Sequence, residues 1–167
     1  SDTQIEQEAI TKEFYKLYKE LRQKLIKNIF INNEEAKKRS RFYELAVEKA
    51  QKIIDRIVFV AFCEDKGLLP ENILSKVIQS DEQSFGSTWN TLKGFFSAID
   101  VGSTKLGNAD GYNGELFKPD SELDKLVIDD DICNEFLKIG QYDFNEDLSV
   151  NILGHIFEQS ISDLEEL

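Results

Sequence analysis

The chain has 167 residues, of which 41% are hydrophobic and 31% charged, and this is enough for one packed domain. No apolar run approaches the roughly 20 residues that a membrane-spanning helix needs. No secretory signal precedes the first amphipathic segment, so we expect no membrane contact and a cytoplasmic location. Cys63 and Cys133 are too few for a disulfide framework or a metal cluster and are expected to be reduced thiols.

The net charge of −12 is distributed unevenly along the chain. Residues 1–66 carry 14 Lys and Arg against 12 Asp and Glu, whereas residues 67–167 carry 6 against 20. An acidic surface repels a phosphate backbone, so any contact with nucleic acid is expected in the N-terminal part. The chain contains no methionine, and "SISDLEEL" stops within a helical pattern. We therefore expect a piece of a longer polypeptide.

Two long helices are predicted first. Residues 4–30 carry apolar side chains at every third or fourth position, which is typical of an amphipathic helix. A second helix should begin near Asn33 or Ser40 and end at Asp65, with Gly67 as its left-handed cap. Its second half, "IIDRIVFVAFC", is apolar nearly all round, which predicts a central helix surrounded by others. The first helix has the apolar stripe Ile10, Phe14, Leu17, Leu21, Leu25 and the lysines Lys12, Lys16, Lys19, Lys27.

Shorter elements follow. Helices are expected over residues 71–80 and within "TWNTLKGFFSAI", and "DVGSTKLGNADGYNGELFKPD" is a glycine-rich loop. "LDKLVIDDD" leaves room for one short strand, and "DDDICNEFLKIG" predicts a helix capped by Gly140. A last helix should start near Ser149. The predicted fold class is mainly all-α: an irregular helical bundle with a long glycine-rich loop and room for one short strand pair.

Signatures of catalysis are weak. No Gly-x-Gly occurs, so the dinucleotide fingerprint and the P-loop are missing, and one histidine with two distant cysteines cannot build a zinc site. Asp55 followed by Glu64-Asp65-Lys66 matches a metal-dependent nuclease pattern, but the pattern is short and falls at a helix end. A solvated helix end is the alternative that we prefer.

The single histidine, His155, lies on the last helix, opposite its predicted apolar stripe. Ile152 and Ile156 flank it, which indicates a second apolar face and a helix packed between two neighbours. His155 is therefore expected at a surface or interface, and Gly154 is expected to allow close packing. The stripe consists of Val150, Leu153, Phe157, Ile161 and Leu164.

The densest basic cluster is "AKKRSRF", which contributes Lys37, Lys38, Arg39 and Arg41. Such a patch is what phosphate binding without base recognition requires. The cluster predicts DNA-backbone contact, and a solvated loop before a helix remains the alternative.

Several segments taken together resemble one family. "AQKIIDRIVFVAFCEDKGLLP", "GYNGELF", "YDF" and "LSVNILGHIFEQSISDLE" are similar, in this order, to the region before the catalytic domain of Type IIG restriction–modification enzymes with an adenine-specific DNA methyltransferase domain. The resemblance covers about residues 42–167. It implies structural or interdomain roles for the matching positions Tyr112, Asn113, Gly114, Leu116, Phe117, Gly154, Phe157 and Glu158.

The resemblance implies a modular parent: a preceding nuclease domain, a helical connector, the methyltransferase and a target-recognition part. Residues 1–140 would form the connector, and residues 141–167 the first helix of the following methyltransferase domain. The parent would use S-adenosylmethionine and Mg²⁺, whereas this chain would hold no cofactor and no metal. The family's Asn/Asp-Pro-Pro-Tyr/Phe tetrapeptide does not occur, since Pro70 and Pro119 are the only prolines.

We therefore expect a non-catalytic spacer that holds the nuclease and methyltransferase modules in a fixed relation, with weak contact to the DNA backbone. The alternative is a stand-alone acidic helical module for protein interaction, unrelated to DNA. The overall charge favours the alternative, and the order of the motifs favours the connector.

Overall fold

The computed structural model describes the chain except residues 1, 81–84, 108–109, 113 and 166–167, and side chains of the last helix as far as Glu158. The described residues are mainly helical, as predicted. The elements are α1 (Asp2–Asn32), α2 (Glu34–Lys37), α3 (Phe42–Asp65), α4 (Ile73–Gln79), α5 (Thr88–Val101), η2 (Thr104–Leu106), α6 (Ser121–Asp124), α7 (Asp130–Glu135), η3 (Phe136–Gln141) and α8 (Val150–Glu165).

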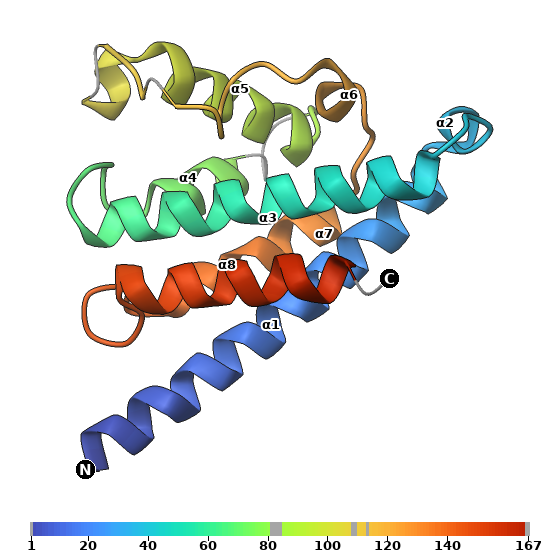
Figure 1. The fold of residues 1–167 in the computed structure, drawn as a ribbon. Coiled ribbons are helices and arrows are strands. Elements are labelled where there is room, and N and C mark those ends of the chain that lie inside the picture. The colour runs from blue at the N-terminus through green and yellow to red at the C-terminus, as the bar shows by residue number, and fades with distance from the viewer. Residues whose placement is uncertain (1, 81–84, 108–109, 113, 166–167) are drawn as a thin grey trace.

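The two long helices organise the fold. α1 runs diagonally and packs mainly on α3, as Figure 1 shows. The predicted stripe of α1 points inward: Phe14, Leu21 and Leu25 are buried, whereas Ile10 and Leu17 are half-buried. The helix boundaries exceed the predicted 4–30 by two residues at each end.

The second long helix starts close to the later of the two predicted positions, two residues after Ser40. α2 is a separate single turn, and α3 begins only at Phe42. Arg41 before it takes a left-handed conformation with φ of 64°, which interrupts the helical path. The predicted end is confirmed: Gly67 has φ of 73°, and the N–H of Leu68 donates to the Cys63 carbonyl at 2.9 Å, as in a Schellman cap.

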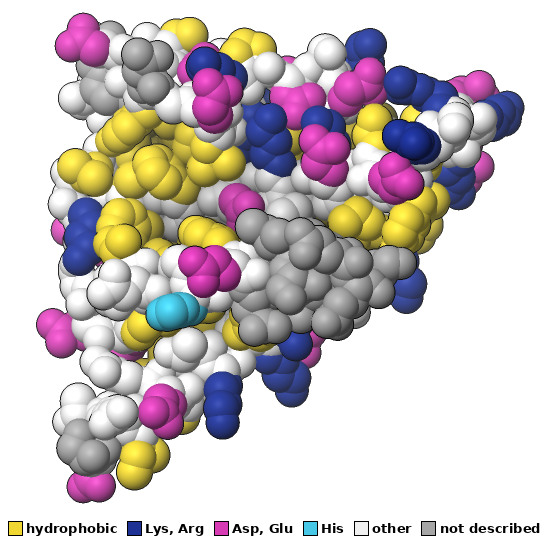
Figure 2. Space-filling view, viewed as in Figure 1, with side chains coloured by type: hydrophobic (Ala, Val, Ile, Leu, Met, Phe, Trp, Pro, Cys, Tyr) yellow, Lys and Arg dark blue, Asp and Glu magenta, His cyan; other side chains and the backbone are white. Residues whose placement is uncertain are grey.

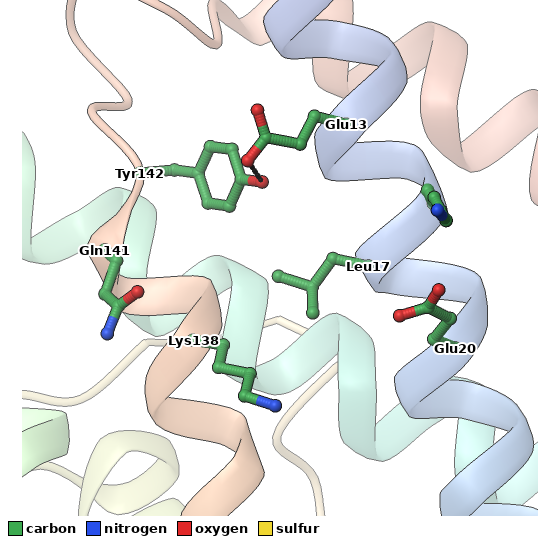
Figure 3. A pocket seen from close by; sticks show the side chains of 7 residues that line it. Glu13, Leu17, Glu20, Lys138, Gln141 and Tyr142 are labelled. Carbon is green, nitrogen blue, oxygen red and sulfur yellow. Dashed lines mark hydrogen bonds between the residues drawn. The ribbon is translucent and has the colours of Figure 1, made fainter.

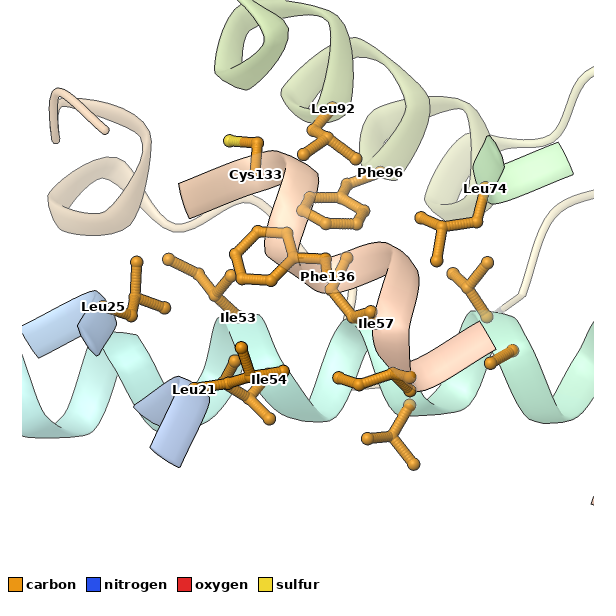
Figure 4. Close-up of a cluster of buried hydrophobic side chains, with 14 of the residues drawn as sticks. Leu21, Leu25, Ile53, Ile54, Ile57, Leu74, Leu92, Phe96, Cys133 and Phe136 are labelled. Atoms are coloured by element: carbon orange, nitrogen blue, oxygen red, sulfur yellow. The ribbon is translucent and has the colours of Figure 1, made fainter. Parts of the chain in front are cut away.

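The core is built mainly against α3, but the prediction that other helices surround its second half holds only in part, since Phe59 and Phe62 are half-buried. Ile53, Ile54 and Ile57 are fully buried, and η3, α4 and α1 pack against the helix that carries them. Figure 4 shows these side chains meeting residues from α1, α4, α5 and α7–η3. The remaining labelled members are Leu21, Leu25, Leu74, Leu92, Phe96, Cys133 and Phe136.

The segment after α6 differs from prediction. No strand occurs in the part of the chain that the structure describes, and residues 126–129 form an extended link between α6 and α7. The helix predicted over "DDDICNEFLKIG" is divided into α7 and η3, and Gly140 lies inside η3. Gly140 is therefore not a cap, because the helical path continues through it to Gln141.

The glycine-rich region after α5 is irregular where it is described, apart from η2. Gly111 has φ of 76°, and a Cβ there would lie 2.3 Å from the backbone oxygen of Asp100. Only glycine fits at this position. The N–H of Tyr112 then donates to the Ile99 carbonyl at 2.9 Å, so the chain returns along the end of α5.

α8 starts where expected, since the Ser149 hydroxyl accepts a hydrogen bond from the N–H of Ile152 at 3.3 Å. Its predicted stripe is partly wrong. Leu153 and Ile156 are buried and Phe157 is half-buried, but Val150 is 63% exposed. α8 passes over α1 and beside α3 (Figure 1), so the row that points between these two helices is buried. The side chains of residues 161 and 164 lie outside the described part.

α8 packs on the core built by the earlier helices rather than standing apart from it. Phe144, Leu148, Leu153 and Ile156 belong to the same hydrophobic cluster as Phe14. The division at residue 140 stays a prediction. In the part of the chain that the structure describes, no helix combines the length and apolarity that crossing a bilayer requires.

Candidate functional site

The predicted DNA-contact cluster gathers at the turn between α1 and α3, and each of its cations has a carboxylate neighbour. The pKa of Arg39 is raised, chiefly because its guanidinium donates a hydrogen bond to Glu122. A cation paired with a carboxylate attracts a phosphate less strongly than a free one. The four pairs are Lys37–Glu34 at 2.9 Å, Lys38–Glu35 at 3.3 Å, Arg39–Glu122 at 2.8 Å and Arg41–Glu44 at 3.9 Å.

An apolar groove of about 400 Å³ runs between α3 and α8. Figure 2 shows hydrophobic side chains gathered over the C-terminal half of α3 and beside α8. Apolar side chains exposed together in this way are typical of a surface that is covered by another molecule or module. The groove is lined by Val58, Phe59 and Phe62 of α3, Leu116 of the loop, and Val150, Leu153, Gly154 and Phe157 of α8, with Asp55 at its wall.

Gly154 keeps the groove open. A Cβ built at this position meets no atom within 4 Å. The expected close packing of a neighbour onto Gly154 is therefore wrong for the chain as it stands. A glycine in a helix interior costs about 1 kcal/mol relative to alanine, so Gly154 does not add to the stability of α8.

Asp55 brings a carboxylate to the wall of this apolar groove. One oxygen accepts hydrogen bonds from the Tyr18 hydroxyl at 2.7 Å and from the Gln51 amide at 2.8 Å. Burial raises the pKa of Asp55, and the hydrogen bonds from Tyr18 and Gln51 act in the opposite direction. Gln51 in turn accepts a hydrogen bond from Arg22 at 3.1 Å, so the carboxylate belongs to a polar network that links α1 to α3.

The loop motif "GYNGELF" is fastened to the outer side of α3. The Tyr112 hydroxyl donates to the Leu68 carbonyl at 2.7 Å, and the buried Phe117 ring lies 5.4 Å from that of Phe59. Gly114 is exposed, and Asn113 lies outside the described residues. Tyr112 and Phe117 thus hold Leu116 at the edge of the groove.

Arg56 of α3 holds the same loop through its backbone carbonyls. Its guanidinium donates to the carbonyls of Leu116 at 2.7 Å and Lys118 at 3.1 Å, and it lies 5.1 Å from the ring centre of Phe96. Only 3% of the residue is exposed, and burial lowers the pKa of Arg56. Nothing in the spacing of the sequence indicated this role.

The short nuclease pattern is dispersed in space. The Glu64 carboxylate accepts a hydrogen bond from the N–H of Leu74 at 2.7 Å, while Asp65 accepts one from the N–H of Phe144 at 2.9 Å. Asp55 faces Tyr18 instead. Within the described ranges, no group of three or more His, Cys, Asp or Glu side chains is placed to hold a metal ion.

A second hollow, of about 550 Å³, lies between α1 and η3 (Figure 3). Its lining mixes Glu13 and Glu20 with Lys16 and Lys138, and the Tyr142 hydroxyl donates to Glu13 at 2.9 Å. Burial, together with the hydrogen bond to Glu13, raises the pKa of Tyr142 to about 12. These contacts tie η3 to α1, and the opposite charges nearly cancel.

His155 is exposed on α8, with 82% of its side chain accessible and the Glu158 carboxylate 3.9 Å away. It lies among lysines of α1 rather than near a nucleophile, in a third hollow that also contains Lys12 and Lys16. The periodicity of α1 revealed these lysines, but it could not show that α8 closes over them.

No family model, curated protein or solved structure matches the chain. The likeness to Type IIG enzymes therefore depends on the quoted motifs alone.

Proposed function

We propose that the chain is a non-catalytic helical connector of a restriction–modification enzyme, which docks the methyltransferase module of its parent and keeps it in a fixed relation to the nuclease module. S-adenosylmethionine and Mg²⁺ would serve the flanking modules, and the proposal assigns neither to this chain. The proposal includes a cytoplasmic location, with which two buried cysteines that form no disulfide are compatible. Burial raises the pKa of Cys63 to about 11, which makes this thiol unreactive.

One observation carries the proposal. Three of the four segments that carry the resemblance, far apart in sequence, converge on a single apolar groove: "RIVFVAF" supplies Phe59, "GYNGELF" supplies Leu116, and "ILGHIFE" supplies Gly154. The fourth segment, "YDF", does not line it. A stiff helical body that presents such a groove is suited to binding an apolar surface of a neighbouring module. Arg56 and Tyr112 prearrange one wall of the groove, which lowers the entropic cost of docking.

The test fills the groove without weakening the helix. Gly154→Leu puts an apolar side chain into the groove and should raise helix stability by up to about 1 kcal/mol. In the polypeptide encoded by the complete gene, we expect this variant to lose methylation and to lose protection from hydrogen exchange over residues 58–62. The matched control is Gly94→Leu on α5, where a Cβ also meets open space.

Wild-type activity and protection in the Gly154→Leu polypeptide would contradict docking at the groove. So would a gene without a downstream Asn-Pro-Pro-Tyr-like tetrapeptide, because the methyltransferase module would then be absent.

A second candidate function is the stand-alone acidic interaction module. The specific observation in its favour is that the exposed cations Lys37, Lys38, Arg39 and Arg41 are all paired with carboxylates in a chain of net charge −12. In that case the groove would bind a separate protein, and the chain would show no affinity for DNA at any salt concentration. DNA binding thus discriminates between the two candidates.

A further inference from the structure

The hollow beside His155 differs in charge from every other concave surface described above. It lies between α1 and α8, has a volume of about 430 Å³, and contains no carboxylate in its lining. The lining side chains that carry charge or can acquire one as cations are Lys12, Lys16, Lys19 and His155. In Figure 2 the histidine, in cyan, lies on α8 just above α1.

The three lysines form one row along α1. They follow each other at intervals of four and three residues, which places them on the same helix face. The row extends over about 10 Å at a rise of about 1.5 Å per residue. α8 forms the opposite wall through His155 and the buried Ile156.

These ammonium groups are available to a ligand, unlike those of the 37–41 cluster. In the described part of the chain no carboxylate lies within ion-pair distance of Lys12, Lys16 or Lys19. The Lys19 ammonium lies 4.6 Å from the centre of the Tyr15 ring, a contact that leaves its charge uncompensated. Lys16 also borders the hollow between α1 and η3, where Glu13 and Glu20 lie, and the Glu13 carboxylate there accepts a hydrogen bond from Tyr142.

The chemistry of the row selects an extended anion. Ammonium groups are donors without acceptors, and three of them in line exceed what one small anion can contact. A DNA strand carries its phosphates as a continuous series of single negative charges, so a row of about 10 Å can contact more than one of them.

We propose that the groove between α1 and α8 binds the phosphate backbone of DNA through Lys12, Lys16 and Lys19. His155 borders the groove, but the Glu158 carboxylate lies 3.9 Å from it, and we assign it no part in the contact. The choice of DNA as the polyanion rests on the proposed function. This proposal assigns the DNA contact to the lysines of α1 instead of the cluster at residues 37–41. Contacts to phosphates carry no base specificity.

The test is a salt titration of DNA binding by the 167-residue chain, measured as fluorescence anisotropy of a duplex of about 20 base pairs with arbitrary sequence. Two variants each remove three positive charges: Lys12→Gln/Lys16→Gln/Lys19→Gln and Lys37→Gln/Lys38→Gln/Arg39→Gln. The α1 variant should lower the slope of log K against log salt by about 2.7, at roughly 0.9 per phosphate contact. The second variant should change the slope by less than a third of that amount.

Equal losses in the two variants would overturn the proposal, since net charge alone would then explain them. A loss confined to the 37–39 variant, or no binding by the wild-type chain at low salt, would overturn it too. Circular dichroism of both variants checks the fold. Failure of the groove variant Gly154→Leu to affect methylation would reject the connector while leaving this result intact, so the two proposals fail separately.

Discussion

The middle of α3 and the turn at residues 34–41 both carry closely spaced cations, but the two regions differ in burial. Lys49 and Lys52 each donate to the Asp120 carboxylate at 2.9 Å, and the side chains of Lys49 and Asp120 are only 11% and 9% exposed. In the turn, the side chain of Lys38 is 75% exposed and that of its partner Glu35 is 91% exposed. Similar runs of charge thus have different roles: the lysines of α3 hold the segment around Asp120 in place, whereas the charges of the turn are solvated.

Burial also separates the electrostatics of the two regions. Burial by itself would raise the pKa of Asp120, but the hydrogen bonds from Lys49 and Lys52 outweigh it and hold this pKa well below its usual range. The surface pairs are screened by water and salt, and such pairs contribute little to stability. The comparison teaches that the number of cations in a segment predicts neither their energy nor their availability to a ligand.

The largest effect is expected where a buried cation loses its partner. Asp120→Ala should lower the free energy of unfolding by about 3 kcal/mol, because the buried Lys49 would keep only the exposed Glu48 carboxylate, at 3.3 Å, as a counter-charge. Asp120 also accepts a hydrogen bond from the N–H of Leu123 at the start of α6. Urea unfolding followed by circular dichroism measures the change. The control, Glu122→Ala, removes the exposed partner of Arg39 and should leave the midpoint within error; equal losses would erase the contrast between the two regions.

Arg56 extends the comparison of buried and exposed cations, because this buried cation contacts backbone carbonyls instead of carboxylates. Arg56→Ala should cost about 2–3 kcal/mol, since the carbonyls of Leu116 and Lys118 lose their donors in a largely buried setting. Hydrogen exchange over residues 111–120 should accelerate more than exchange in α1. Arg56→Lys keeps the charge but not the planar fork, and it should fall between the wild type and Arg56→Ala. Full recovery by lysine would show that charge alone matters here.

The pH dependence of the free energy of unfolding also distinguishes the buried pair at Asp120 from the surface pairs. The pKa of Asp120 is lower in the folded than in the unfolded chain, so its contribution is fully present above the unfolded value of about 3.9 and declines as the pH falls through the lower folded value. Comparison with Asp120→Asn isolates this group. The stability difference between wild type and variant should stay constant above about pH 5 and shrink below about pH 4. A difference that persists unchanged to about pH 2 would contradict this account.

The smallest effect concerns Asp55, a half-buried residue whose carboxylate has Arg22 as its neighbouring cation. Because burial raises its pKa, its charged form opposes folding above the unfolded pKa and does not below it. Asp55→Asn keeps an oxygen that can accept from Tyr18 and Gln51. The variant should therefore be as stable as the wild type at pH 7, or more stable by about 1 kcal/mol. Thermal unfolding at neutral pH measures it, and a loss of stability would show that the Asp55 charge is needed by the network.

Features that depend on neighbours along the chain were predictable. The periodicity of residues 4–30, the apolar run of α3, the Gly67 cap and the start of α8 near Ser149 are local, since each is set by residues within one or two helical turns. The resemblance likewise drew attention to Leu116, Gly154 and Phe157 before their convergence was visible. The helical class of the fold followed from these local patterns.

Tertiary contacts decided which of the predicted features act together. Lys37, Lys38 and Arg41 pair with carboxylates only three residues away, which the sequence could show. Arg39 meets Glu122, 83 positions away, and Lys49 meets Asp120, 71 positions away, so no local pattern could show these two contacts or the burial of the second. The inward face of α8 was set by its place over α1 and α3, which left Val150 exposed. Helix periodicity determines which residues share a face, but only packing against distant helices determines which face is buried and which charges remain free.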